Sequence, residues 1–201
     1  MNTGSGKTVV GLMILKSCIN EGKFPVVYVC PDKYLVKQVL DAAKELGVEV
    51  TDDVKSPRFL SGKAILVVNV YKLVNGKSVF GVGDSGAKIN ISSMVIDDAH
   101  ACIDTVEDQF TINIPPGLGA YNEIYDVVRN SLYAECESKA IEIEAGDPTS
   151  YMQVPYWAWQ ENISEISRVL IKYSGEECLM FSWPLVKENP KLSNCVVGAK
   201  G

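Results

Sequence analysis

A glycine-rich turn that ends in lysine and threonine stands at the start of the chain: Thr3, Gly4, Ser5, Gly6, Lys7 and Thr8. The backbone N–H groups of such a turn can surround phosphate oxygens, a lysine adds positive charge near the outer phosphates, and a threonine hydroxyl can bind Mg²⁺. Apolar residues follow at helical spacing and predict a helix whose N-terminus points at the phosphates. The turn therefore predicts an ATP site with Lys7 on the phosphates and Thr8 on the metal ion.

Two adjacent carboxylates, Asp97 and Asp98, follow an apolar run at residues 92–96. A buried parallel strand delivers an acid in this way to the carboxyl edge of its sheet. We therefore expect Asp97 beside the phosphates, where it would bind the same Mg²⁺ as Thr8. The two patterns together are more specific than either alone, and they predict one site for ATP and Mg²⁺.

The order of these patterns resembles that of a known family. TGSGKT followed by DDAH at residues 97–100 resembles the first RecA-like domain of superfamily-two helicases of the DEAD/DEAH-box type, whose second motif is usually DEAH. Residues 26–31, a strand that ends in proline, resemble motif Ia of that family. Residues 64–73 resemble the stretch before the DEAH motif in helicases of the nucleotide-excision-repair and damage-inducible group. The resemblance implies an ATP hydrolase that moves along or unwinds nucleic acid, DNA or RNA, with a single strand as its partner.

The resemblance also implies roles for individual residues. In the family a glutamate at the place of Asp98 orients or deprotonates the attacking water, and aspartate is one methylene shorter. Either Asp98 still acts as the catalytic base, through a small shift or a second water, or the chain is a slow or inactive ATPase. The retained position and charge favour the first. His100 stands where the family's histidine links the nucleotide site to motif III.

Three residues beyond a predicted strand stand where the family contacts a nucleic-acid backbone: Asn69, Tyr71 and Lys72. Stacking on a base or contact with a phosphate is one interpretation of these residues, and ordinary loop packing is the other.

Hydrolysis in this family needs a second RecA-like domain, whose arginines neutralise charge on the γ-phosphate. We find no such domain within the 201 residues, so this chain alone is expected to be inactive or very slow. Two alternatives to a helicase remain: a P-loop ATPase switch or nucleotide-binding module that acts without nucleic acid, and an inactive truncated fragment. DNA-stimulated or RNA-stimulated ATP hydrolysis by the complete protein would distinguish them.

The composition limits the partners. A net charge of −6 argues against a broad basic surface, so nucleic acid would be held by local contacts. The six cysteines lack the close spacing of a metal site, so the four-cysteine cluster of the iron–sulfur helicases is not expected here. The sequence contains neither a signal peptide nor an apolar stretch that predicts a membrane partner, and we expect a cytoplasmic protein.

Alternating strand and helix patterns predict the fold class: an α/β domain with a P-loop, RecA-like parallel sheet and flanking helices. Strands are predicted at 26–30 and 64–68, and a helix is predicted at 33–46 with Asp32 as its N-cap. The full loop pattern, GxxxxGKT, would place its first glycine at Met1, after a strand. The sheet is therefore expected to be incomplete at its N-terminus.

Pro115-Pro116-Gly117 predicts a domain boundary. We expect a partial RecA-like ATP-binding domain over residues 1–115 and a mostly helical accessory insertion over residues 116–194. Residues 179–183 are expected to form a strand within that insertion. Residues 195–201 are expected to start a strand that returns to the parallel sheet.

Overall fold

The structure is a computed structural model that describes residues 6–82, 86, 88–199 and 201. Contacts between residues divide the chain into two compact units, residues 1–109 and residues 110–201. Each unit has its own apolar core, and each is described by itself.

Four parallel strands form the sheet of the first unit: β1 (Val26–Cys30), β2 (Val50–Thr51), β3 (Ile65–Asn69) and β4 (Ser93–Ile96). Their order is β2-β3-β1-β4. β1 and β3 are runs of mostly β-branched residues buried along their whole length, as a parallel strand covered on both faces requires. The predicted α/β fold with a parallel sheet is confirmed.

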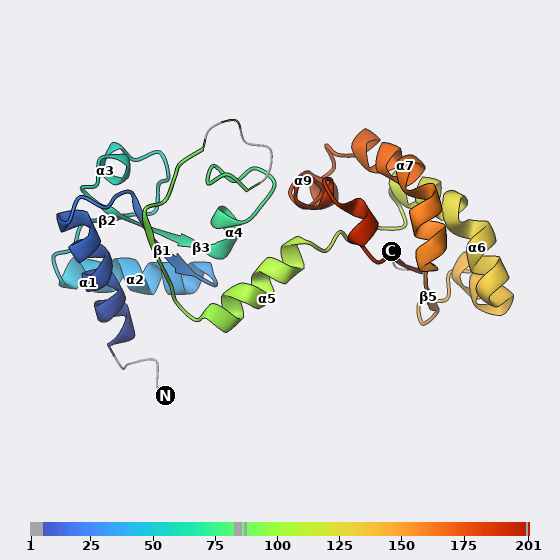
Figure 1. Cartoon of the computed structure of the whole chain (residues 1–201). Coiled ribbons are helices and arrows are strands. Elements are labelled where there is room, and N and C mark those ends of the chain that lie inside the picture. Colours follow the sequence, from blue (N-terminus) through green and yellow to red (C-terminus); the bar gives the residue numbers. More distant parts are fainter. Residues whose placement is uncertain (1–5, 83–85, 87, 200) are drawn as a thin grey trace. The chain divides into compact units, whose positions relative to one another are not determined.

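In the described part of the first unit, helices flank this sheet on both faces. α1 (Lys7–Asn20) and α2 (Lys33–Glu45) cover one face, while α3 (Pro57–Leu60), α4 (Val70–Leu73) and α5 (Ala99–Gln109) contribute to the core on the other (Figure 1). Alternate residues of β1 therefore enter two different cores. The core under α1 and α2 includes Leu12, Leu15, Val26, Tyr28, Cys30, Val39 and Ala43. The core on the opposite face includes Val27, Val29, Phe59, Leu66, Val68, Val70 and Cys102.

The predicted start of α2 is confirmed. The carboxylate of Asp32 accepts a hydrogen bond of 2.8 Å from the backbone N–H of Leu35, as an N-cap residue does. Val39 and Ala43 turn from this helix toward the sheet and are almost completely buried. The position of α2 matters for the site, because its N-terminus follows β1 directly at the carboxyl edge.

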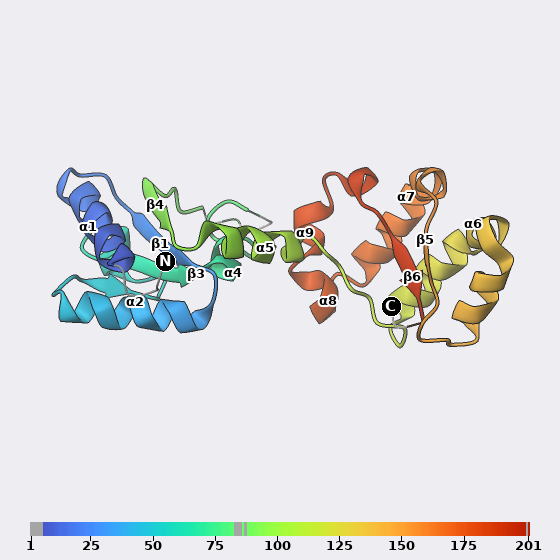
Figure 2. The ribbon, with the colours of Figure 1, turned by 90° about the horizontal axis from the view of Figure 1, so that it is seen from below.

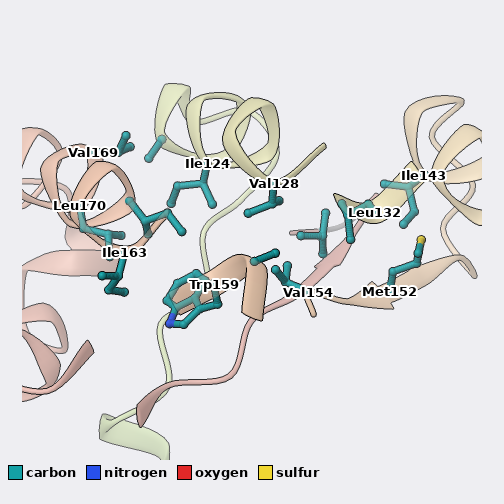
Figure 3. Close-up of a cluster of buried hydrophobic side chains, with 14 of the residues drawn as sticks. Ile124, Val128, Leu132, Ile143, Met152, Val154, Trp159, Ile163, Val169 and Leu170 are labelled. Carbon is teal, nitrogen blue, oxygen red and sulfur yellow. The ribbon is translucent and has the colours of Figure 1, made fainter. Parts of the chain in front are cut away.

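The second unit is mostly helical and has its own core. Its long helices are α6 (Gly119–Glu144) and α7 (Tyr156–Lys172). A two-stranded antiparallel sheet, β5 (Tyr151–Gln153) with β6 (Val196–Gly198), lies against α6 (Figure 2). Figure 3 shows side chains of the core, which come from both helices and from residues around β5: Ile124, Val128, Leu132, Ile143, Met152, Val154, Trp159, Ile163, Val169 and Leu170.

Two sequence-based predictions for the second unit are wrong. Residues 179–183 are not a strand: α8 (Glu177–Met180) covers the start of that range, and α9 (Trp183–Val186) begins at its end. Leu179 and Trp183 are buried at helical spacing, which a short, mostly apolar run does not distinguish from a strand. The strand predicted within residues 195–201 does form, but its partner is β5 and not the parallel sheet.

Helix α6 is kinked at Cys136, whose φ of −159° and ψ of 97° are not helical. Glu144, at the end of the helix, holds the two halves together. Its carboxylate accepts hydrogen bonds from the hydroxyls of Tyr125 and Tyr133 and pairs with Arg129 at 2.7 Å. Cys136 thereby stands at the corner of the kink, where its thiol interacts with the Ser138 hydroxyl.

The environments of the cysteines predict their order of reaction with iodoacetamide near neutral pH. All six are free thiols. Burial and then the charge of Asp97 raise the pKa of Cys30 to about 12, and burial raises the pKa of Cys195 to about 11. The hydrogen bond with Ser138 lowers the pKa of Cys136. Because the thiolate is the nucleophile, we expect peptide mass spectrometry to find Cys136 alkylated first and Cys30 and Cys195 last. In urea these differences should disappear, and rapid labelling of Cys30 in the folded protein would contradict the described core.

Candidate nucleotide site

The end of the glycine-rich turn forms the start of α1. Gly6 has a φ of +76°, a left-handed conformation that glycine adopts without steric cost, and it is the N-cap of the helix. Among the described residues, no side chain caps α1 and no acid occupies its first turn. The free N–H groups and the helix dipole therefore favour an anion at this end. Lys7 is exposed there and Thr8 is half-buried; Thr3, Gly4 and Ser5 lie outside the described residues.

Asp97 lies at the carboxyl edge of the sheet, directly after β4. Its backbone N–H donates to the carbonyl of Val29 in β1 at 2.8 Å, and its own carbonyl accepts from the Sγ of Cys102 at 3.4 Å. The chain leaves β1 toward β2 and β3 on one side and later returns to add β4 on the other. The crevice between β1 and β4 is thus the point where the strand order reverses, which is where open α/β sheets bind their ligands.

Tyr28 of β1 links the turn to Asp97. Its ring is buried, with 1% of the residue exposed, and its hydroxyl donates to the Oδ2 of Asp97 at 3.2 Å. The side chain of Thr8 is among the groups that shift the pKa of the same hydroxyl, and its effect is to lower that pKa. Thr8 and Asp97, the two expected Mg²⁺ ligands, therefore converge on one tyrosine oxygen.

Tyr28 is a site residue that the sequence patterns do not predict. The signal was present, because a tyrosine inside an aliphatic buried strand needs a partner for its hydroxyl. The sequence does not show which residue is that partner, because Asp97 lies far from Tyr28 along the chain.

Carboxylates dominate the electrostatics of this edge. Burial and the charge of Asp97 together raise the pKa of the Tyr28 hydroxyl well above its usual value. Burial, followed by the charges of Asp98 and Asp97, raises the pKa of Cys102. The neighbouring hydroxyl and thiol therefore stay neutral, and the carboxylates provide the hard oxygen ligands that Mg²⁺ prefers. Thr8 and Asp97 fit a Mg²⁺ ion by the chemistry of their donor atoms.

Asp98 has two structural features of its own. Its φ is +47°, in the left-handed region that aspartate tolerates better than most residues. Its carbonyl accepts from the N–H of Cys102, and its Oδ1 accepts from the N–H of Ala101 at 3.4 Å, so it caps the start of α5. Asp98 is exposed at the same edge as Asp97. His100 is also exposed, in the first turn of α5.

The three residues expected at a nucleic-acid backbone have different surroundings. Asn69 is buried and caps α4, accepting from the N–H of Lys72 at 3.3 Å. The Lys72 ammonium donates to the carbonyl of Asp52 at 3.0 Å. Tyr71 is 44% exposed. Of the three, Tyr71 offers the most surface to a ligand.

An open groove lies where β1 and β3 end. Its volume is about 580 Å³, and it is lined by Asp32, Lys33, Tyr34, Asn69 and Tyr71. Two tyrosines, 70% and 44% exposed, face solvent there. Because β1 stands between β3 and β4, the groove and the Tyr28–Asp97 pair occupy adjacent stretches of one sheet edge.

The family model for the DEAD/DEAH box helicase matches residues 1–114, more than half of the chain. The chain belongs to the DEAD/DEAH box helicase family. No curated protein and no solved structure matches it. Family membership makes DDAH at residues 97–100 the counterpart of the motif that names the family, with Asp98 in place of glutamate. The likeness to the nucleotide-excision-repair and damage-inducible group stays a prediction.

Two further features of the described residues bear on other kinds of site. No helix among them is long and apolar enough to cross a membrane. No three His, Cys, Asp or Glu side chains in the same part of the chain are grouped as a metal site would group them. A Mg²⁺ ion held by Thr8, Asp97, phosphates and water does not need such a group.

The capping role of Asp98 can be separated from any role in catalysis. Asp98→Asn keeps the cap and tolerates the left-handed backbone, so we expect near-native stability. Asp98→Ala removes the cap and tolerates the left-handed backbone less well, so it should lower the free energy of unfolding by about 1 to 3 kcal/mol. Urea unfolding followed by far-UV circular dichroism measures the difference. Trp157, Trp159 and Trp183 all lie in the second unit, so tryptophan fluorescence serves as an internal control that should not change. Equal losses for both variants would contradict the cap.

Proposed function

We propose that residues 1–115 are the ATP-binding RecA-like domain of a nucleic-acid helicase, which holds ATP and Mg²⁺ between the Gly6–Thr8 turn and Asp97. The observation that carries this proposal is the convergence of Thr8 and Asp97 on the hydroxyl of Tyr28. Two side chains with oxygen ligands come together beside an uncapped helix N-terminus at the point where the strand order reverses. This combination suits a triphosphate and its metal ion better than either element alone.

Each residue has a defined task in this proposal. The residues of the turn, Thr3 to Thr8, hold the phosphates, and the Lys7 ammonium balances charge on the outer ones. Thr8 and Asp97 are the protein ligands of Mg²⁺. When bound, the ion would neutralise charge on the phosphates and fix their orientation. Asp98 is the base that orients or deprotonates the attacking water, through the oxygen that does not cap α5. His100 couples the site to the rest of the motor.

The groove at the ends of β1 and β3 is the proposed contact with single-stranded DNA or RNA. Tyr34 and Tyr71 present exposed rings on which bases can stack, and Lys33 supplies one local cation. Asp32 also lines the groove, and the chain carries a net charge of −6. Stacking is therefore the main attraction in this proposal, and contacts with phosphates are few.

Hydrolysis and movement belong to the complete motor. The resemblance places the arginines that act on the γ-phosphate in a second RecA-like domain, and we propose that domain as the partner of this site. Residues 116–194 are proposed as a helical accessory segment. The chain alone is then expected to bind ATP without brisk turnover.

Nucleotide binding is tested by titrating the chain with a fluorescent ATP analogue in the presence of Mg²⁺. Lys7→Ala should weaken binding about tenfold or more, because a hydrogen bond to a charged group contributes about 1.5 to 3 kcal/mol. Lys16→Ala is the matched control, since it removes the same charge from the same helix. Equal affinities for these two variants would refute the proposed phosphate site.

Nucleic-acid binding is tested by fluorescence anisotropy with labelled single-stranded DNA and RNA. Tyr34→Ala and Tyr71→Ala should each weaken binding roughly fivefold to a hundredfold, the range expected for the loss of one stacked base. Phenylalanine at either position should preserve binding, because the ring remains. Tyr151→Ala, an exposed tyrosine of the second unit, serves as control. An absence of binding to either nucleic acid, with ATP binding intact, would favour the nucleotide-controlled interaction module.

A further inference from the structure

The ring of Tyr28 has a fixed place in the core. In β1 it is in register with Val67 of β3 and Val95 of β4, and α1 covers it. The ring belongs to the apolar core, and only its hydroxyl reaches the polar edge. Packing thus determines where the oxygen lies, before any ligand arrives.

Gly11 of α1 makes room for this ring. A Cβ at Gly11 would lie 2.7 Å from the Cε2 of Tyr28 and 3.2 Å from a methyl carbon of Val95. The first distance is shorter than real Cβ contacts, so any larger residue would have to push the ring or the helix away. Gly11 is thus the gap in α1 through which Tyr28 can approach Thr8, one helical turn before it.

The direction of the hydrogen bonds is compatible with metal binding. Tyr28 has one proton and donates it to the Oδ2 of Asp97, so its oxygen can only accept a hydrogen bond from the Thr8 hydroxyl, which is the direction in which Thr8 lowers the pKa of Tyr28. A bond in that direction uses neither lone pair of the Thr8 oxygen, and within the described part of the chain no hydrogen bond reaches the Oδ1 of Asp97. A chain from Thr8 to Tyr28 to Asp97 therefore orients both ligands while leaving their acceptor sites open to a cation.

We propose that Tyr28 is a positioning residue of the Mg²⁺ site and that Gly11 is the space that admits it. Tyr28 does not touch the ion; it holds Thr8 and Asp97 at a fixed separation and in a fixed orientation. This inference rests on the proposed function, because it assumes that the two residues bind the metal ion of a nucleotide. Partners of this kind orient metal ligands in many proteins, and their loss typically weakens metal affinity 10- to 100-fold.

The test compares the Mg²⁺ requirement of nucleotide binding in the wild-type chain and in Tyr28→Phe. The phenylalanine ring fills the same space, so far-UV circular dichroism should be unchanged. We expect the Mg²⁺ concentration at half-maximal binding of a fluorescent ATP analogue to rise about 10-fold or more. Binding measured in EDTA should stay the same. Tyr121→Phe is the matched control, because it also removes a tyrosine hydroxyl that donates a single hydrogen bond, here to the carbonyl of Gly198.

A second variant tests the role of Gly11. Gly11→Ala should also raise the Mg²⁺ concentration at half-maximal nucleotide binding. The double variant, Gly11→Ala with Tyr28→Phe, should need no more Mg²⁺ than the more affected single variant, because both substitutions disturb the same contact of Tyr28 with the site. Should Gly11→Ala fail to fold, Tyr28→Phe decides alone.

The outcomes separate the two proposals. One outcome is that the wild-type chain binds the nucleotide with Mg²⁺ and that Tyr28→Phe has the same Mg²⁺ requirement. This outcome would overturn the positioning role of Tyr28 but would not contradict the nucleotide site. A wild-type chain whose nucleotide binding does not respond to Mg²⁺ would overturn both.

Discussion

The parallel pairing of β1 with β4 is the constraint on which the site depends. Val29 is in register with Ile96, and the next hydrogen bond, from the N–H of Asp97 to the carbonyl of Val29, carries the pairing one residue beyond the strand. Successive side chains of a strand point to opposite faces, so a slip of one residue would move Asp97 to the face opposite α1. The hydrogen bond from Tyr28 to Asp97 exists only in the observed register.

The buried sheet also bears on how an acidic chain would hold the two anionic ligands that we propose for one edge. Strands buried along their length form a rigid platform, and side chains at their ends are held by packing and by short local bonds. At the β1–β4 end, a free helix N-terminus and Lys7 offset the carboxylates, and a divalent cation suits those carboxylates. At the β1–β3 end, exposed tyrosines offer an attraction that does not depend on net charge. The two ends therefore favour different parts of an ATP-driven motor.

Local patterns predicted most of the first unit, and distant contacts account for what was missed. The strand at Val26–Cys30 and the cap at Asp32 follow from residues within one element, and the sequence identified both. Tyr28 and Gly11 were missed because their meaning comes from a contact between α1 and β1, which no periodicity reports. The pairing of β6 with β5 was missed for a related reason. Strands of three residues carry too little pattern to specify a partner, and β6 pairs within the core of the second unit.

Asp98 caps α5 in the structure, and the proposed function gives the same side chain a role in the reaction. Aspartate is among the preferred N-cap residues and tolerates a positive φ, whereas glutamate is favoured for neither. The residue at this place starts α5 with one carboxylate oxygen and a left-handed backbone. A glutamate would extend further toward an attacking water but would cap the helix less well. Compared with glutamate, the aspartate therefore caps the start of α5 better but extends less far toward an attacking water. Its second oxygen remains at the sheet edge, and under the proposed function the position of the water relative to that oxygen would determine whether the site hydrolyses ATP or only binds it.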